Sequence, residues 1–450
     1  MHNKMWKRPI NKYLLVLISV LVLANIRAQE VLTLQRAIEI GLQNNYSILI
    51  SRNDAAIAVN DNTIGNAGFL PYVNLSATQN NVITNTHQET FTGSVKDVKG
   101  AKNRNLNAGV QLTWTLFDGF SMFVNKDMLN ILEEMGETDA RIALENTVSQ
   151  IILGYYGIIQ QQRLVQVLRD AAALSLERKT IMEARISLGA GSGLMLLQST
   201  VDLNVDSINL IRAMAAVKQS RAEFNRILAL NPETDLTLAD SIVLQEPMSY
   251  DSLLALARSQ NTDLLIARNN VDLSELTLKN EQSARYPLLN LNAAYNYSQL
   301  NSQTGFLEYN RSLGPSFGLT LSYPLFDGLN VNRAIKNARI GLKSSEYQLR
   351  ETDLGLHTDI LQLWIDYMTN LKVVQIELVN QDVARENVVV AYEKYQLGTI
   401  NDIELRETQK KYIDAQYELL LSQFQAKKAE VELLRVSGQL GKLINEMTTE

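Results

Sequence analysis

Three histidines and a few carboxylates are the side chains through which this chain of 450 residues could do chemistry. His2 lies in the N-terminal segment, His87 in a polar stretch, and His357 in a long helical pattern that explains it as a surface or packed residue. The chain has no HExxH, no phosphate-binding loop and no GxSxG, and the glycine-rich run 189–193 fits no such spacing. It has no cysteine, which excludes thiol nucleophiles, zinc ribbons and disulfides. We therefore predict no catalytic, cofactor-binding or metal site.

The polar residues that we single out are Asp402 and Glu404, which follow a tight turn at Gly398 and Thr399. In one interpretation they only stabilise the start of a helix, where the dipole favours an acid by roughly 0.3–1 kcal/mol. In the other, oligomer symmetry places them in a ring at a pore mouth, where carboxylates attract cations and repel anions. Tyr395, just before the turn, belongs to the same candidate pore or gate ring.

The elements that position this turn come from an internal duplication. The sequence Leu-Phe-Asp-Gly occurs at 116–119 and again at 325–328, 209 residues later. The same offset relates Leu188-Gly189 to Leu397-Gly398, whereas Asn45 and Asn261, like Pro71 and Pro287, are 216 residues apart. The difference of seven residues must lie between the prolines and the Leu-Phe-Asp-Gly motifs. A repeat of this length predicts two copies of one structural unit.

Each Leu-Phe-Asp-Gly motif ends an alternating pattern and begins a helical one. Asp118 and Asp327 are suited to cap the helices, and Gly119 and Gly328 tolerate the bend between strand and helix. Pro71 and Pro287 mark the earlier change, from helix to strand, because proline disfavours helix in the residue before it. The first of these earlier helices is expected from Thr33 to about Phe69.

Residues 1–28 read as a signal peptide, with a basic start, an apolar stretch of about 11 residues and Ala28 before the cleavage point. An uncleaved anchor is the alternative. Without this segment the chain has 37 basic and 48 acidic residues, so its negative charge disfavours nucleic acid as a partner. No later segment has 18 consecutive apolar residues.

Alternation of apolar and polar residues predicts four strands, at about 72–84, 105–116, 288–297 and 315–323. The polar positions are Asn, Gln, Ser, Thr and Gly, with almost no charge, and the stretches between paired strands are expected to be loops. A soluble sandwich alternates in the same way. We favour membrane strands, because no further strands exist for a second sheet. Four strands cannot close a barrel, so several chains must pool their strands.

After each Leu-Phe-Asp-Gly motif, heptad-like spacing predicts a helix of about 70 residues, roughly 100 Å long, that packs as a coiled coil. Each helix ends at a glycine turn and a return helix follows. The expected organisation is a first repeat at 29–230, a linker or equatorial segment at 231–249, a second repeat at 250–438 and a tail at 439–450. The chain is therefore predicted to be mainly α, with a pair of membrane β-hairpins.

The duplicated helix–hairpin–helix unit, the paired Leu-Phe-Asp-Gly motifs, the prolines and the Leu-Gly turns resemble the TolC-type outer-membrane efflux proteins. The resemblance covers nearly all of the chain after residue 28. It implies a homotrimer in the outer membrane of a Gram-negative bacterium. Three chains would form a 12-stranded β-barrel, with four strands from each, and an α-helical barrel in the periplasm. The implied partners are a periplasmic adaptor protein, an inner-membrane transporter of RND or ABC type, and outer-membrane lipid.

The resemblance also implies a gate at the turn. Tyr395, Gly398 and Thr399 match the family's gate motif and Asp402 matches its first ring acid, whereas Ile400 occupies the usual arginine position. Leu405 stands at the second ring acid, with Glu404 nearby, and the first-copy turn has Gly193 at the corresponding point. The adaptor is expected to dock at the turns that contain the residues Gly189, Gly193, Gly398 and Thr399.

The predicted function is a passive export channel that performs no catalysis. A periplasmic or surface coiled-coil scaffold without a pore is the rival from another class, and an envelope hydrolase lacks a nucleophile or metal set. Drug efflux, metal efflux and type I protein secretion remain open, because the cargo depends on the inner-membrane partner.

Overall fold

The computed structural model describes residues 31–238, 241–246, 248–304 and 307–441. The predicted signal peptide, Pro247 and most of the C-terminal tail lie outside the described residues. The chain forms two compact units. The helical unit takes the described residues within Met1–Leu49, Ile142–Asn261 and Leu356–Glu450, and the sheet unit takes Ile50–Arg141 and Thr262–Gly355.

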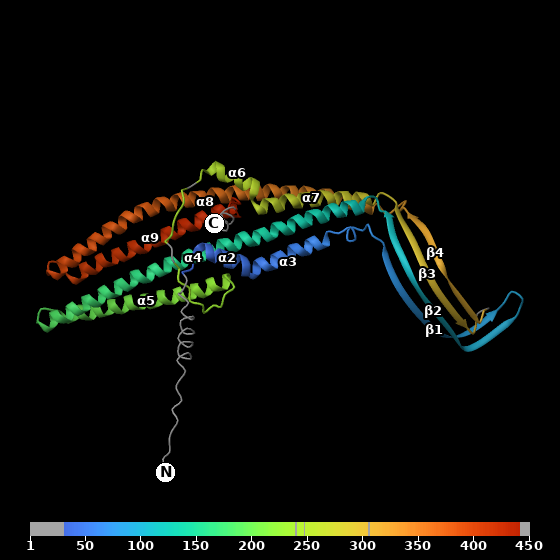
Figure 1. The fold of residues 1–450 in the computed structure, drawn as a ribbon, viewed down its shortest axis with the longest axis horizontal. Helices are drawn as coiled ribbons and strands as arrows, with labels where there is room; N and C mark the ends of the chain where they lie inside the picture. The colour runs from blue at the N-terminus through green and yellow to red at the C-terminus, as the bar shows by residue number, and fades with distance from the viewer. Residues whose placement is uncertain (1–30, 239–240, 247, 305–306, 442–450) are drawn as a thin grey trace, which may run out of the picture. The chain divides into compact units, whose positions relative to one another are not determined.

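Each repeat contains two shorter helices, two strands, a long helix and a return helix, in that order (Figure 1). The first repeat consists of α2 (Leu34–Asn44), α3 (Tyr46–Asp61), β1 (Tyr72–Glu89), β2 (Val95–Phe117), α4 (Ser121–Ser187) and α5 (Gly193–Ile227). The second consists of α6 (Tyr250–Gln260), α7 (Thr262–Ser283), β3 (Leu288–Ser302), β4 (Tyr309–Ser322), α8 (Asn330–Gln396) and α9 (Asp402–Val436). The described chain is thus mainly α with four strands, as predicted.

The first helix of each repeat is interrupted by an asparagine, so the prediction of one continuous helix from Thr33 to Phe69 was wrong. Asn45 has extended backbone, and its Nδ2 donates to the Ile227 carbonyl at 2.7 Å. Asn261 does the same, donating to the Val436 carbonyl at 3.0 Å. Each amide thereby ties the break to the end of the return helix. Such a contact depends on distant residues, and local periodicity does not reveal it.

The four strands form one antiparallel sheet in the order β1-β2-β3-β4. Residues directly opposite one another share a face. One face is therefore apolar, with Leu75, Val110, Tyr295 and Pro315 in register, and the other carries the polar row next to it. The strands extend beyond their predicted bounds into the stretches expected to be loops. Exposed hairpins pair through their backbones, so the polar side chains at 96–104 do not end β2.

The two Leu-Phe-Asp-Gly motifs form matching turns. The Asp118 carboxylate accepts from the Met122 N–H at 2.9 Å, and the Asp327 carboxylate accepts from the Val331 N–H at 2.6 Å. Gly119 and Gly328 have φ of 72° and 71°, in the left-handed region that favours glycine. The long helices begin two residues after each glycine. The surroundings differ, however, since a Cβ on Gly119 would lie 2.3 Å from the Ser283 carbonyl oxygen.

The core of the helical unit is built on the middle of α4. Val148, Ile151, Tyr155 and Ile158 are buried there at the predicted heptad spacing, and the Tyr155 hydroxyl donates to the Leu32 carbonyl at 2.9 Å. The buried members contributed by other segments are listed here: Leu32, Ala37, Ile38, Phe224, Ile227, Leu228, Val431 and Leu440.

A buried ion pair holds the linker against the helices. Lys427 Nζ lies 2.7 Å from Glu430 and donates to the Val243 carbonyl at 2.8 Å. Glu430 in turn accepts from the Gln245 N–H at 3.2 Å, and the Tyr367 hydroxyl donates to the Gln245 carbonyl at 2.5 Å. Burial and the charge of Glu430 raise the pKa of Tyr367, so its hydroxyl stays a donor at alkaline pH values at which a free tyrosine ionises.

Candidate functional site

The two helical hairpins of the helical unit, α4–α5 and α8–α9, end in tight turns at the same end of the unit (Figure 1). Gly189 and Gly398 both have φ of 76°, and no atom lies within 4 Å of an added Cβ at either position. Leu188 and Leu397, next to them, are 81% and 80% exposed. These turns therefore need glycine for the backbone conformation and present an apolar side chain to solvent.

The other predicted tip residues have structural roles in these turns. Thr399 Oγ1 donates to the Lys394 carbonyl at 2.9 Å and so bonds the end of α8. Gly193 is the first residue of α5 and has open space around it. Docking of an adaptor at these turns stays a prediction.

Asp402 is buried, at 4% exposure, at the start of α9. Arg178 of α4, which is 1% exposed, reaches it with two nitrogens, Nη2 to Oδ2 at 2.6 Å and Nε to Oδ1 at 3.1 Å. This two-point geometry is the strongest arrangement between an arginine and a carboxylate. The pair links the α4–α5 hairpin to the α8–α9 hairpin.

A second arginine makes the same link in the opposite direction. Arg406 of α9 donates to both carboxylate oxygens of Asp206 on α5, at 2.7 and 2.9 Å. The Ser175 hydroxyl donates to Asp206 at 2.5 Å. Asp202 lies between the arginines, 3.3 Å from Arg178 and 3.6 Å from Arg406. We call these five charged residues, Arg178, Asp202, Asp206, Asp402 and Arg406, the inter-hairpin cluster.

Charge within the cluster is nearly balanced, with two guanidinium groups against three carboxylates. The pKa of Arg406 is raised overall. Burial is the largest single influence and acts to lower this pKa, but the hydrogen bond and charge of Asp206, together with the charges of Asp202 and Asp402, outweigh burial. Arg406 therefore remains charged. Removal of one partner from such a buried pair typically costs about 3–5 kcal/mol, because the other charge is left unpaired. The cluster thus favours one arrangement of the two hairpins over others.

Tyr395 packs beside the cluster and is fully buried. The Arg185 guanidinium lies 4.6 Å from its ring centre and donates to its carbonyl at 2.8 Å. Burial is the main cause that raises the pKa of Tyr395; the charge of Asp402 adds to it, and Arg185 and Arg178 oppose it. Nearby, the Tyr392 hydroxyl donates to Glu177 of α4. Two further contacts therefore cross between α4 and α8.

Glu404 differs from Asp402, although both were placed in one candidate ring. Glu404 is exposed, and its N–H donates to Asn401 Oδ1 at 2.8 Å in an ordinary helix cap. In this chain Asp402 faces Arg178 and is shielded from solvent, so Glu404 is the acid that remains open to water. The ring function itself stays a prediction.

Sequence reasoning missed Arg178, Arg406 and their partners, although the duplication contained a signal. At the offset of 209 residues, Arg178 corresponds to Asn387, Arg406 to Leu197 and Asp402 to Gly193. The cluster therefore occupies positions at which the two copies differ in charge. A comparison of the two copies for positions at which only one of them has a charged residue would have found the cluster.

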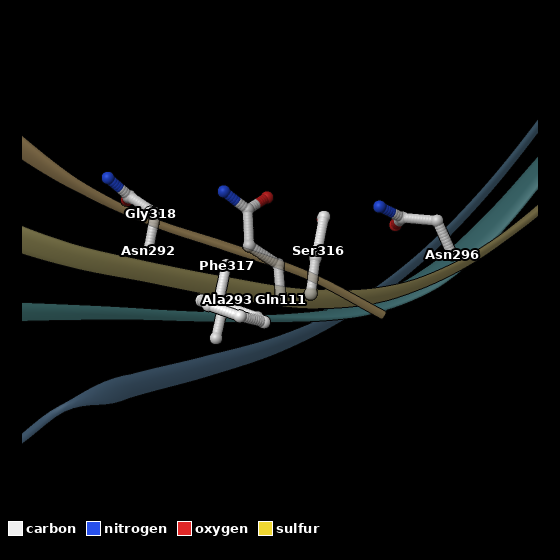
Figure 2. Close-up of a pocket in the computed structure, with 8 residues that line it drawn as sticks. Gln111, Asn292, Ala293, Asn296, Ser316, Phe317 and Gly318 are labelled. Atoms are coloured by element: carbon white, nitrogen blue, oxygen red, sulfur yellow. The ribbon is translucent and has the colours of Figure 1, made fainter. Parts of the chain in front are cut away.

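The polar face of the sheet is the second candidate surface. Figure 2 shows Gln111, Asn292, Asn296 and Ser316 on one side of the sheet, with Phe317 on the other. They line an open hollow, in which the Asn292 amide donates to a Thr320 hydroxyl at 3.2 Å. This face offers amides and hydroxyls without charge, so it can hydrogen-bond to water and to polar solutes of either sign.

In the described part of the chain, no group of three or more His, Asp or Glu side chains could hold a metal ion. No described helix is both long and apolar enough to cross a membrane.

Comparisons with known proteins agree with this architecture. The model of the outer membrane efflux protein family matches residues 253–439. The outer membrane protein TolC of Salmonella enteritidis is 24% identical over 392 residues, 79% of this chain and 76% of that protein. The alkaline protease secretion protein AprF of Pseudomonas aeruginosa is 20% identical over 420 residues, 90% of this chain and 85% of that protein.

Among solved structures, the Campylobacter jejuni CmeC outer membrane channel has the same fold, with a TM-score of 0.77 at 15% identity over 92% of this chain and 89% of that one. Together with the sequence matches, it confirms the resemblance to TolC-type outer-membrane efflux proteins that the duplicated motifs predicted. The fold class and the placement in the outer membrane, with a periplasmic helical part, are confirmed with it.

Proposed function

We propose that this TolC-type outer-membrane efflux protein is the exit duct of a tripartite efflux pump or a type I secretion system. It conducts cargo passively, and the energy comes from an inner-membrane transporter of RND or ABC type through a periplasmic adaptor. The observation that carries the proposal is the four-stranded sheet, which has one exposed apolar face and one polar face with almost no charge and is joined to two long helical hairpins. The relatives include both TolC and a protein named for protease secretion, so small molecules and polypeptides both remain candidate cargo.

Open sheet edges support a homotrimer. β1 and β4 each pair on one side only in the single chain. In a membrane every backbone polar group needs a partner, so these edges must meet edges of other copies. Three copies of four strands give twelve, enough to close a β-barrel. The apolar face that would then meet lipid is exposed here, with Phe317, Leu319 and Leu321 at 85%, 65% and 67%.

Apolar stripes on the helices support the same assembly. The exposed side chains on α5 recur every three or four residues and are listed here: Leu194, Leu197, Val201, Val205, Ile208 and Ile211. A similar set on α8 is Leu361, Ile365, Ile376, Val379, Val383 and Val390. Faces with this spacing pack against other helices in coiled coils. A neighbouring copy would cover them and continue the helical barrel.

The inter-hairpin cluster is proposed as the lock that keeps the tip closed. Its pairs hold the α4–α5 hairpin to the α8–α9 hairpin, so the hairpins can separate only when Arg178 leaves Asp402 and Arg406 leaves Asp206. Glu404, which is exposed beside them, is the proposed ring acid for cation selectivity. The turns at Gly189 and Gly398 are the proposed adaptor dock.

Assembly is tested by cell fractionation, followed by light scattering in mild detergent with the detergent mass subtracted. We expect a trimer from the outer membrane. A water-soluble monomer or dimer would overturn the duct and favour the coiled-coil scaffold.

The gate is tested in planar bilayers with Asp402→Lys and Glu404→Lys. We expect Asp402→Lys to raise conductance, because it repels Arg178, and Glu404→Lys to reduce cation selectivity at unchanged closure. Unchanged conductance in Asp402→Lys would contradict the lock. Unchanged selectivity in Glu404→Lys would contradict the ring.

Docking is tested with Leu188→Glu and Leu397→Glu, because substitution of the glycines would strain the turns themselves. We expect loss of crosslinking to the adaptor in both variants, because each places a charge on a leucine that the turn presents to solvent. Full crosslinking in both Glu variants would exclude these turns as the dock.

A further inference from the structure

A group of exposed basic side chains lies on the apolar face of the sheet, at the hairpin end of its apolar residues, where Ile83 is opposite Lys102 and Leu106 is in register with Arg311 through Gln299. Lys102 and Arg104 are on β2 and Arg311 is on β4, and all three are exposed. In register, Arg104 lies opposite Asn301 and Arg311 opposite Gln299. Adjacent positions on each strand alternate between faces, so all three side chains share the face of Val110 and Tyr295. We call these three residues the basic band.

The apolar residues below the basic band form a belt of about the thickness of a membrane. On β2 they run from Trp114 to Leu106, a span of eight residue-to-residue steps, or about 27 Å along a strand. A tilt of about 40° reduces this to about 21 Å across the membrane, close to the roughly 25 Å apolar band of known barrels. The next outward-facing residue is Arg104. The basic band therefore lies at the depth of the lipid headgroups.

The direction of the chain decides which headgroups these are. The long helices follow β2 and β4 at the opposite end of the sheet from the two hairpin turns. Since the helical part is periplasmic, the hairpin turns point outward. The basic band lies on the hairpin side of the apolar belt and so faces the outer leaflet.

The basic band forms no ion pair with a carboxylate in the part of the chain that the structure describes. Arg311 instead lies over Tyr297, with its guanidinium carbon 5.5 Å from the ring centre. At the same end of the sheet Asp97 is paired with His87 at 2.6 Å. The amides of Gln299 and Asn301 lie between the two arginines and add neutral donors.

We propose that the basic band binds the phosphate groups of phosphorylated glycolipids in the outer leaflet. Arginine offers the planar donors that match phosphate oxygens, and lysine adds a point charge. An exposed basic side chain at headgroup depth attracts anionic lipid, whereas it would be unfavourable within the apolar belt. The inference rests on the proposed placement of the sheet in the membrane.

The test compares three variants of the full-length protein in mild detergent. Lys102→Gln/Arg104→Gln/Arg311→Gln removes the basic band. Lys336→Gln/Arg339→Gln/Lys343→Gln removes the same charge from exposed positions on α8. Lys102→Arg/Arg104→Lys/Arg311→Lys keeps the charge in place. Native mass spectrometry measures the binding of bisphosphorylated lipid A, of lipid A without phosphate and of phosphatidylglycerol.

We expect the first variant to bind bisphosphorylated lipid A at least about tenfold more weakly, and the other two to bind it like the original protein. The original protein should prefer it to the phosphate-free form and to phosphatidylglycerol. Equal binding by the first variant and the α8 variant would overturn the inference, as would equal affinity for all three lipids.

Conductance in planar bilayers, measured on the same preparations, separates this inference from the proposed function. A first variant that still assembles and conducts, but binds lipid A normally, would refute the basic band alone. Absence of a conducting trimer in every preparation would refute the duct itself.

Discussion

Asn45 and Asn261 occupy equivalent places in the two repeats and make the same hydrogen bond, each to a carbonyl at the end of its own return helix. At the tip, Asp402 and its counterpart Gly193 make no such equivalent contact. Asp402 pairs with Arg178, whose own counterpart is Asn387. The repeated residues build the unit twice, and the unrepeated charges fix how the two hairpins meet. The two copies therefore share the contacts that build each unit and differ in charge where the two hairpins meet.

Breaking the inter-hairpin cluster should have the largest effect. Arg178→Ala leaves the Asp402 carboxylate buried without its partner, and we expect a loss of about 3–5 kcal/mol in unfolding free energy. Chemical denaturation checks this. The matched control is Arg226→Ala, which breaks the exposed pair with Glu223 and should leave stability unchanged. Arg178→Met/Asp402→Leu should recover most of the loss. An Arg178→Ala protein as stable as the control would show that the cluster does not contribute to the free energy of unfolding.

Gly119 and Gly328 sharpen the comparison, because they occupy the same position in the repeated Leu-Phe-Asp-Gly motif but have different atoms around them. Gly119→Ala should cost about 3 kcal/mol, since it combines left-handed strain with a close contact to the Ser283 carbonyl oxygen. Gly328→Ala should cost only about 1–2 kcal/mol, because an added Cβ meets just the Asn330 side chain at 3.5 Å. Thermal unfolding of the two variants measures the difference. Equal costs would mean that the turn at Gly119 relaxes freely.

The repeated asparagines should behave alike. Asn45→Ala and Asn261→Ala each leave a carbonyl at the end of a return helix without its donor, and we expect each to cost about 1–3 kcal/mol. Hydrogen exchange at the ends of α5 and α9 should rise in the corresponding variant only. A cost confined to one of the two would contradict their structural equivalence.

The smallest effect concerns alkaline pH. Burial raises the pKa of Tyr395 above the ordinary tyrosine value of 10, so the folded state holds the proton more tightly than the unfolded state. Its contribution is complete below pH 10 and is lost as pH rises through the folded-state pKa. Tyr395→Phe should therefore weaken the loss of stability above pH 10. Denaturation at pH 9 and pH 11 checks this, with Tyr347→Phe, an exposed tyrosine on α8, as the control.

Much of the fold followed from local sequence. The period of two at 72–84 and the heptad spacing around Tyr155 indicated element types, and the paired motifs located Asp118 and Asp327 as helix caps. The strand ends and the break at Asn45 were missed, because backbone pairing and a contact with Ile227 decide them. These depend on partners rather than on neighbours in sequence.

By itself, the sequence determined the duplication, the order of the elements and the nearly uncharged polar face of the sheet, because each of these depends on residue types at fixed short spacing. Whether Asp402 is buried and which residue it pairs with was decided only by the tertiary structure. Its partner Arg178 is 224 residues away, and the two meet because α4 and α9 pack together. Spacing alone described Asp402 and Glu404 as similar acids at one turn. Packing buried the first in an ion pair and left the second in water, since burial depends on what a distant helix places opposite.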